Sequence, residues 1–226
     1  MSNNRYHGKY DSIELATADI KERALKRIKK LYGPDGQNTK AYHNLDHTLA
    51  VIDAAERIAQ LGLSRKLIVP ERDIHLVTIA AVWHDGRHSR RHGAGYNEYV
   101  SAQMAARAMQ ETGVFSQRET KAVQGMIKGT EVKFVDGKVI QQANPKNYLQ
   151  KVIADADLSN LGQPFDFYWQ TAEKVYEEVM GEPGSEQAIA KMSLGFITGH
   201  EFLTDEAVEL FPHQDENIAE LEKLVS

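Results

Sequence analysis

Apolar residues recur at three- and four-residue intervals along most of the chain, and this spacing restricts the fold class more than any other feature of the sequence. The segment 12–31 shows it first, with Ile13, Ala16, Ile20, Ala24 and Ile28 separated by polar and basic residues. Such spacing gives a helix one apolar stripe that must be buried against other elements. Because the pattern returns in about ten segments joined by short loops, we predict an all-α bundle.

Capping residues and glycines set the expected helix boundaries. Asn44 and Asn97 are suitable N-caps, Gly62 is a suitable stop, and Ser116 begins the Ser-x-x-Glu pattern of a capping box. Asn144 stands before a proline, as at the start of a helix. Helices are therefore predicted over residues 12–31, 44–61, 70–82, 98–112, 116–128, 145–157, 164–180 and 185–202, with a short one after Thr204 and a last one over 213–224.

One segment interrupts the helical pattern. Residues 131–142 place β-branched side chains on both sides of Asp136-Gly137. An Asp-Gly pair in such surroundings favours a tight turn between two strands. We therefore predict a short β-hairpin, or at least an extended excursion, within 131–142.

Length, charge and composition limit the class of protein. The chain has 226 residues, with no internal repeat or linker, so we expect one domain over 1–226 with a loose arm at 1–11. A net charge of -5 argues against a stable nucleic-acid partner. No apolar run approaches the roughly 20 residues of a membrane span, and the polar start lacks the core of a signal peptide, so the cytoplasm is the expected location. Oligomerisation is left open.

Metal-ligand residue types gather at the end of one apolar segment. His84-Asp85-Gly86 follows the run 74–82, and His43 and His47 stand four residues apart, which places both rings on one side of a helix. With no cysteine in the chain, a closed thiolate zinc site is excluded. Histidine and aspartate together suit a catalytic divalent ion with open positions for water and substrate. The alternative is a set of surface or capping side chains.

A second acidic pair follows the apolar segment 152–154. Asp155 and Asp157 are two residues apart, so on a helix they point about 200° away from each other. Only one of them is expected to face an ion, and spacing does not decide which. An unpaired carboxylate in such apolar surroundings would be costly, and a metal ion would offset that cost.

Cationic and aromatic residues are the remaining candidates for substrate contacts. The stretch 87–92 is either a solvated loop or a phosphate-binding wall, since guanidinium groups bind phosphate oxygens in pairs. Arg87 and His88 are nearest the His-Asp pair, and Arg90 follows them. Lys128 could face the same cavity, although a lysine near a helix C-terminus needs no active site to explain it. Phe196 is the aromatic residue best placed to contact a substrate.

In combination, these blocks resemble the HD-domain metal-dependent phosphohydrolases. From about residue 42 to the C-terminus, the order of blocks is similar to that of small bacterial predicted HD phosphohydrolases. The shared blocks are Tyr42-His43-Asn44 with His47-Thr48, Trp83-His84-Asp85, Asn97-Glu98 with Ser101-Ala102, Ile127 with Thr130, Asp155-Ala156-Asp157-Leu158 with Leu161-Gly162, Phe202-Leu203-Thr204 and Asn217-Ile218-Ala219.

Three blocks also resemble the catalytic domain of class I cyclic-nucleotide phosphodiesterases: Tyr42 to His47, His84 to His88, and Asp157 to Asn160. This resemblance implies that His43 donates a proton to the leaving oxygen. It implies a first metal on His47, His84, Asp85 and Asp157, with Asp85 bridging to a second metal near His88, and with Glu98 as a supporting carboxylate. The choice of Asp157 leaves Asp155 as a helix-end or supporting carboxylate. Ser193 stands where those enzymes carry a purine-holding glutamine, while Phe196 keeps the position of their stacking phenylalanine.

The function predicted from these blocks is metal-dependent hydrolysis of a phosphate ester of a nucleotide, either a diester or a monoester. One or two divalent ions (Mn, Fe, Mg or Zn) activate a water molecule, His43 is the acid, and Arg87 or His88 neutralises developing charge. A 5'-nucleotidase or a guanosine polyphosphate hydrolase would use the same site. The alternative from another class is a metal- or nucleotide-sensing module with little turnover.

Overall fold

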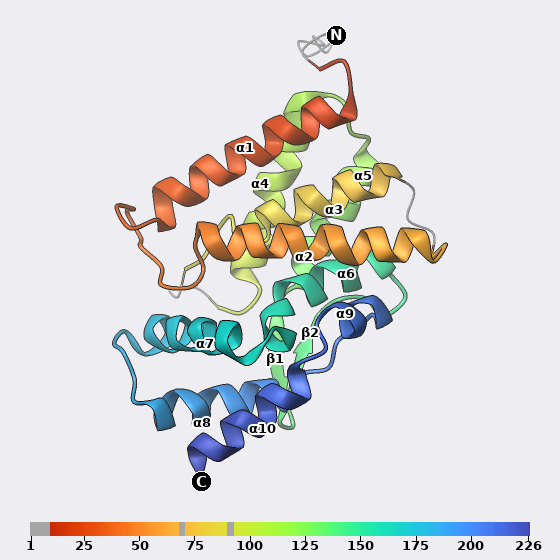
Figure 1. Cartoon of the computed structure of the whole chain (residues 1–226). Coiled ribbons are helices and arrows are strands. Elements are labelled where there is room, and N and C mark those ends of the chain that lie inside the picture. Colours follow the sequence, from red (N-terminus) through yellow and green to blue (C-terminus); the bar gives the residue numbers. More distant parts are fainter. Residues whose placement is uncertain (1–9, 68–70, 90–92) are drawn as a thin grey trace.

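The computed structural model describes residues 10–67, 71–89 and 93–226, and within them the predicted all-α architecture is confirmed (Figure 1). These residues form ten α-helices, one short 3-10 helix (η1) and one two-stranded hairpin. The elements are α1 (Ile13–Tyr32), α2 (Leu45–Ser64), α3 (Glu71–Trp83), α4 (Tyr96–Thr112), α5 (Gln117–Gly129), β1 (Val132–Val135), β2 (Lys138–Gln141), α6 (Tyr148–Asp157), η1 (Ser159–Gly162), α7 (Phe165–Met180), α8 (Glu186–Ile197), α9 (Asp205–Leu210) and α10 (Gln214–Val225).

Helices α1, α2, α4, α5 and α6 pack around α3, whose residues from Leu76 to Trp83 are all buried. A helix buried on every side must lie at the centre of a bundle, and α3 contacts α1, α2, α4, α5 and α6. The C-terminal end of this central helix is where the sequence places His84 and Asp85. The core of the bundle therefore fixes the position of that pair.

A second, smaller cluster joins η1, α7, α8 and α10 through Leu161, Tyr168, Ile197 and Leu221. The buried side chain of Asn217 in α10 donates hydrogen bonds to the carbonyl oxygens of Leu161 and Gln163. Figure 1 shows this C-terminal layer below α2, and α7 is the helix of the layer that faces α2. The site described below lies where the two layers meet.

The hairpin predicted within 131–142 is present. Strands β1 and β2 pair antiparallel, and the turn residues Asp136 and Gly137 have φ values of 50° and 76°. Two positive φ angles match the twist of a two-residue hairpin and explain the Asp-Gly pair. The amide of Val139 donates to the carbonyl of Gly199 at 2.8 Å, which attaches the hairpin to the end of α8.

Several predicted helix boundaries are confirmed and others are wrong. Asn44 and Thr204 cap α2 and α9, and the capping box at Ser116 is complete. Gly62 does not stop α2, which continues to Ser64; instead it lets the Tyr148 ring approach closely. Asn144 is not a helix cap, because Asn147 caps α6.

Two other expectations need a comment. Helix α4 begins at Tyr96, so Asn97 lies inside its first turn, where its side chain holds the backbone of Ser89 by two hydrogen bonds. The expected N-terminal arm falls mostly on residues 1–9, which lie outside the described residues. Among the described helices, none combines the length and apolar character that crossing a membrane requires.

Candidate metal centre and active site

Three elements of the N-terminal bundle bring the four predicted metal ligands together. His47 lies in the first turn of α2, His84 and Asp85 directly follow α3, and Asp157 is the last residue of α6. The backbone turns at Gly86, whose amide bonds the carbonyl of Trp83 and which packs closely against the Trp83 ring. A side chain at this glycine would clash with that ring, so the turn depends on it.

The facing atoms of these four side chains lie within a narrow range of distances. The Nε2 atoms of His47 and His84 are 3.1 Å apart. Asp157 Oδ1 lies 3.3 Å from His47 Nε2 and 3.4 Å from His84 Nε2, while Asp85 Oδ2 lies 3.5 Å and 3.3 Å from the same two nitrogens. All four groups therefore converge on one small volume.

That volume suits a divalent ion. Bonds of about 2.0–2.1 Å to nitrogen and oxygen place neighbouring ligands about 3.0–3.4 Å apart in octahedral or tetrahedral shells, close to the separations observed. Asp85 Oδ2 is buried, makes no hydrogen bond and faces only the two imidazole nitrogens, and a buried carboxylate oxygen of this kind is costly without a cation. The donor set and its spacing thus fit a bound metal ion.

The orientation of His84 also favours coordination. Its Nδ1 donates to the carbonyl of Ala81 at 2.6 Å, which leaves Nε2 to face the other three groups. Such a bond from the second ring nitrogen is how proteins fix a metal-binding imidazole. Although burial alone would lower its pKa, the carboxylates of Asp85 and Asp157 raise the pKa of His84 well above its usual value.

A second group of candidate ligands adjoins the first. His43, Asp85 and His88 each offer one atom within 4.8 Å of the others. While Asp85 Oδ2 faces His47 and His84, its Oδ1 lies 3.4 Å from His88 Nδ1. One carboxylate therefore touches both groups, as the predicted bridging role requires. Burial lowers the pKa of His88, but its bond to Asp85 and the charges of Asp85 and Glu178 together outweigh that effect, so the pKa is raised.

Sequence reasoning missed Glu178, which lies near the end of α7. Its Oε1 accepts from His43 Nδ1 at 2.8 Å, and its Oε2 accepts from the backbone amides of Tyr42 and His43. Lys40 Nζ lies 3.5 Å and His88 Nε2 lies 3.6 Å from Oε1. Burial would raise the pKa of Glu178, but these bonds hold it well below its usual range. No local pattern marks this residue.

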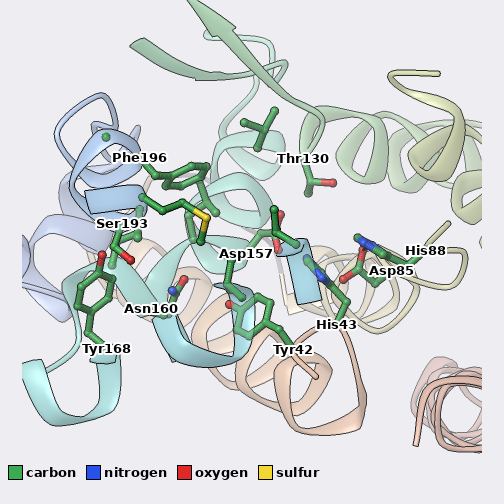
Figure 2. A pocket seen from close by; sticks show the side chains of 18 of the residues that line it. Tyr42, His43, Asp85, His88, Thr130, Asp157, Asn160, Tyr168, Ser193 and Phe196 are labelled. Carbon is green, nitrogen blue, oxygen red and sulfur yellow. Dashed lines mark hydrogen bonds and ion pairs between the residues drawn. The ribbon is translucent and has the colours of Figure 1, made fainter. Parts of the chain in front are cut away.

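A cavity of about 620 Å³ opens beside these groups (Figure 2). His43, Asp85, His88 and Asp157 line one side of it, with Glu98 and Thr130 nearby. Figure 2 shows Phe196, Ser193 and Tyr168 on the side away from His43 and His88. The predicted substrate residues Ser193 and Phe196 therefore share a cavity with the candidate ligands.

Other predicted residues lie elsewhere. Arg87 and Lys128 do not line this cavity: the Arg87 amide bonds Ser101, and the ammonium group of the exposed Lys128 lies over the Tyr99 ring. Arg90 lies outside the described residues. Glu98 does line the cavity, and burial followed by the charge of Asp85 raises its pKa.

Asp155 points away from the candidate ligands, as its spacing from Asp157 predicts. Its two oxygens accept from the amide of Leu203 and the hydroxyl of Thr204. Burial raises the pKa of this carboxyl to about 6. The contacts of Asp155 attach α6 to the start of α9.

Two solved structures resemble the chain in fold. No protein-family model and no curated protein matches its sequence. The phosphodiesterase domain of Salpingoeca rosetta rhodopsin phosphodiesterase aligns with a TM-score of 0.65 and 17% identity, over 94% of this chain and 83% of that chain. The phosphodiesterase domain of the RhoPDE fusion protein from the same choanoflagellate aligns with a TM-score of 0.61 and 17% identity, over 97% and 93%. The chain has a phosphodiesterase-like fold. At this identity the likeness concerns the fold alone.

Proposed function

We propose that the protein is a metal-dependent phosphohydrolase that cleaves a phosphodiester with water. The observation that carries this proposal is the convergence of His47, His84, Asp85 and Asp157 at 3.1–3.5 Å beside a cavity that also contains His43. Two imidazoles and two carboxylates are a donor set for a hard or borderline divalent ion. The phosphodiesterase-like fold is consistent with this chemistry.

These four side chains would hold a divalent ion, which would supply positive charge to the phosphate oxygens and lower the pKa of a water molecule. His43 then serves as the general acid for the departing alcohol oxygen. Its Nδ1 is held by Glu178, so the proton passes from Nε2. His88, stacked on His43 with ring centroids 3.8 Å apart, limits the movement of that ring.

The charge of the cavity favours a diester over a monoester. Asp85, Asp157 and Glu98 line it, whereas no lysine or arginine does so in the described part of the chain. A monoester carries up to two negative charges near neutral pH and a diester carries one. Because the carboxylates that hold the ion offset its charge and no lysine or arginine adds to it, we infer that the monoanion binds better.

Two finer predictions from the sequence stay predictions and are not part of this proposal. Membership of the small bacterial HD phosphohydrolase branch and a nucleotide as the ester both rest on the motif resemblance. The nucleotide prediction is tested directly by including cyclic nucleotides among the substrates assayed.

The deciding assay measures release of p-nitrophenol from bis(p-nitrophenyl) phosphate and from p-nitrophenyl phosphate. The metal-stripped protein receives Mn²⁺, Fe²⁺, Mg²⁺ or Zn²⁺ in turn. We expect metal-dependent turnover of the diester, with kcat/KM above that of the monoester. Turnover of neither ester despite bound metal would favour a sensing module, and faster turnover of the monoester would contradict the diester assignment.

A further inference from the structure

The part of the cavity away from the metal ligands is apolar. Leu161, Val175 and Val179 come from η1 and α7, and Met192 and Phe196 come from α8. In Figure 2, Phe196 lies across the cavity from His43 and Asp85. A phosphate group at the metal centre would leave this apolar volume for the organic part of the ester.

Polar side chains in that region already have partners. Tyr168 and Ser193 are both buried, and Ser193 lies close enough to the Tyr168 hydroxyl to lower its pKa, which burial raises to about 12. Asn160 Nδ2 donates to Thr171, and the hydroxyl of Thr130 donates to the carbonyl of Ile127. The exception is Asn160 Oδ1, a buried acceptor without a partner. Hydroxyl oxygens in the region can each accept a further bond, but Asn160 Oδ1 is the one buried acceptor without a partner among the described residues that line it.

Such an apolar wall would bind a nucleobase weakly. Its several donors and acceptors would lose water and find few partners on this largely apolar wall, and each buried group left unpaired costs binding energy. An alkyl chain has no such groups, and it gains from contact with every apolar side chain that it covers. Hydrogen-bond satisfaction therefore favours an apolar substituent.

The apolar surface also continues out of the cavity. Phe134 of β1 lines it and remains 68% exposed, and Val179 of α7 lines it at 52% exposed. The Phe134 ring meets Phe196 edge to face, with centroids 5.8 Å apart. Exposed aromatic and aliphatic side chains at the mouth of a cavity are a contact surface for a group that extends beyond it.

We infer that the substrate is a phosphodiester with an alkyl or acyl chain, which runs from the metal centre along α7 and α8 to Phe134 and Val179. This assignment of substrate class rests on the proposed function for the position of the phosphate. The hairpin takes part in substrate binding, because Phe134 contacts the end of the chain that is farthest from the metal centre.

The test is calorimetric binding of n-alkyl methylphosphonates, which carry one negative charge, to the full chain with Mn²⁺, with an assay for released alcohol to verify that the ester stays intact during the titration. Methyl, butyl and octyl esters are compared with cyclic AMP. We expect affinity to rise by up to about fourfold for each methylene added within the cavity. Binding should also show an increasingly negative heat-capacity change. Affinity that is independent of chain length, or tighter binding of cyclic AMP than of the octyl ester, would overturn the inference.

Variants of the hairpin provide a second readout. Phe134→Ser should weaken octyl ester binding by about tenfold and leave methyl ester binding unchanged, because only the longer chain reaches the rim. Val135→Ser is the matched control, since Val135 is the next strand residue, is also exposed and does not line the cavity. Phe134→Leu should recover most of the affinity. Equal losses in the two serine variants would contradict the role of Phe134.

The two proposals fail in different ways. If bis(p-nitrophenyl) phosphate is hydrolysed but the alkyl series binds without dependence on chain length, the substrate class is wrong and the proposed function stands. If the octyl ester binds with the expected dependence but no diester is hydrolysed, the hydrolytic function is wrong and the apolar site stands.

Discussion

His43 and Glu178 belong to different layers of the fold, and the 2.8 Å bond between His43 Nδ1 and Glu178 Oε1 joins them beside the metal centre. Glu178 also accepts from the amides of Tyr42 and His43, so one carboxylate fixes both the ring and the backbone that carries it. Its side chain is only 7% exposed. Helix α7 therefore sets the orientation of the proposed general acid.

The first prediction concerns this bond. In Glu178→Gln the side chain can still accept from the amides, but it loses the charge that raises the pKa of His43. Burial, the largest influence, already lowers that pKa, so it should fall further. Protonated His43 is then lost at lower pH, and the alkaline limb of the kcat profile should move to lower pH. We expect kcat to drop by about 10- to 100-fold near neutral pH.

Glu177→Gln is the control for that experiment, because Glu177 is the preceding residue of α7 and is exposed. It should leave both kcat and the pH profile unchanged. An unshifted alkaline limb in Glu178→Gln would show that Glu178 does not act through His43.

The second prediction separates acid catalysis from metal binding. His43→Ala should keep its metal content and lose about 10²- to 10⁴-fold in rate, the usual contribution of a general acid. The loss should be greater for a phenyl ester than for a p-nitrophenyl ester, because phenolate is the poorer leaving group and needs the proton more. Equal losses for the two esters, measured with the same metal, would rule out the acid role.

Much of the fold could be predicted from local sequence. The apolar spacing in α1 predicts a helix, and the Asp136-Gly137 pair predicts a hairpin turn, each from a few neighbouring residues. Predicted helix boundaries were wrong where a contact with a residue distant in sequence determines the local structure. Gly62 is a plausible helix stop, yet it allows contact with Tyr148 while α2 continues past it.

The candidate site also contains residues that the sequence predicts and one that it does not. His47, His84, Asp85 and Asp157 carry recognisable residue types and spacing, and the fold brings them together. Glu178 could not be found in this way, because it stands 135 residues from His43, on a helix with two other glutamates. Its role arises only when α7 packs against the segment before α2.

The third prediction concerns His200, which is 3% exposed and packs edge to face against Phe202. Burial lowers its pKa to about 4, from about 6.5 in the unfolded chain. As pH falls between these values, the unfolded chain takes up the proton first, so stability decreases. The decrease should reach about 3 kcal/mol at most.

The measurement is urea unfolding of wild type and His200→Gln at several pH values from about 7 to about 4. The difference between the two proteins should change with pH in favour of the variant, which removes the titrating ring. A difference that is constant over this range would show that His200 does not titrate on unfolding.

The fourth prediction concerns removal of the metal. An ion that binds only the folded chain, present at about 100 times its Kd, stabilises it by about 2.7 kcal/mol. For a chain of this size, chelation should then lower Tm by about 5–10 °C. Differential scanning calorimetry with and without chelator checks this. A Tm that does not respond to chelator in a metal-loaded sample would contradict binding at the proposed centre.

If one centre built on Asp85 holds the metal, elemental analysis of purified variants will show it. Asp85→Ala removes the carboxylate that faces both His47 and His84, whereas Asp46→Asn changes an exposed carboxylate beside His47. The account predicts full metal content and diesterase activity in Asp46→Asn, and loss of both in a folded Asp85→Ala protein. Full metal content with unchanged turnover in Asp85→Ala would contradict it.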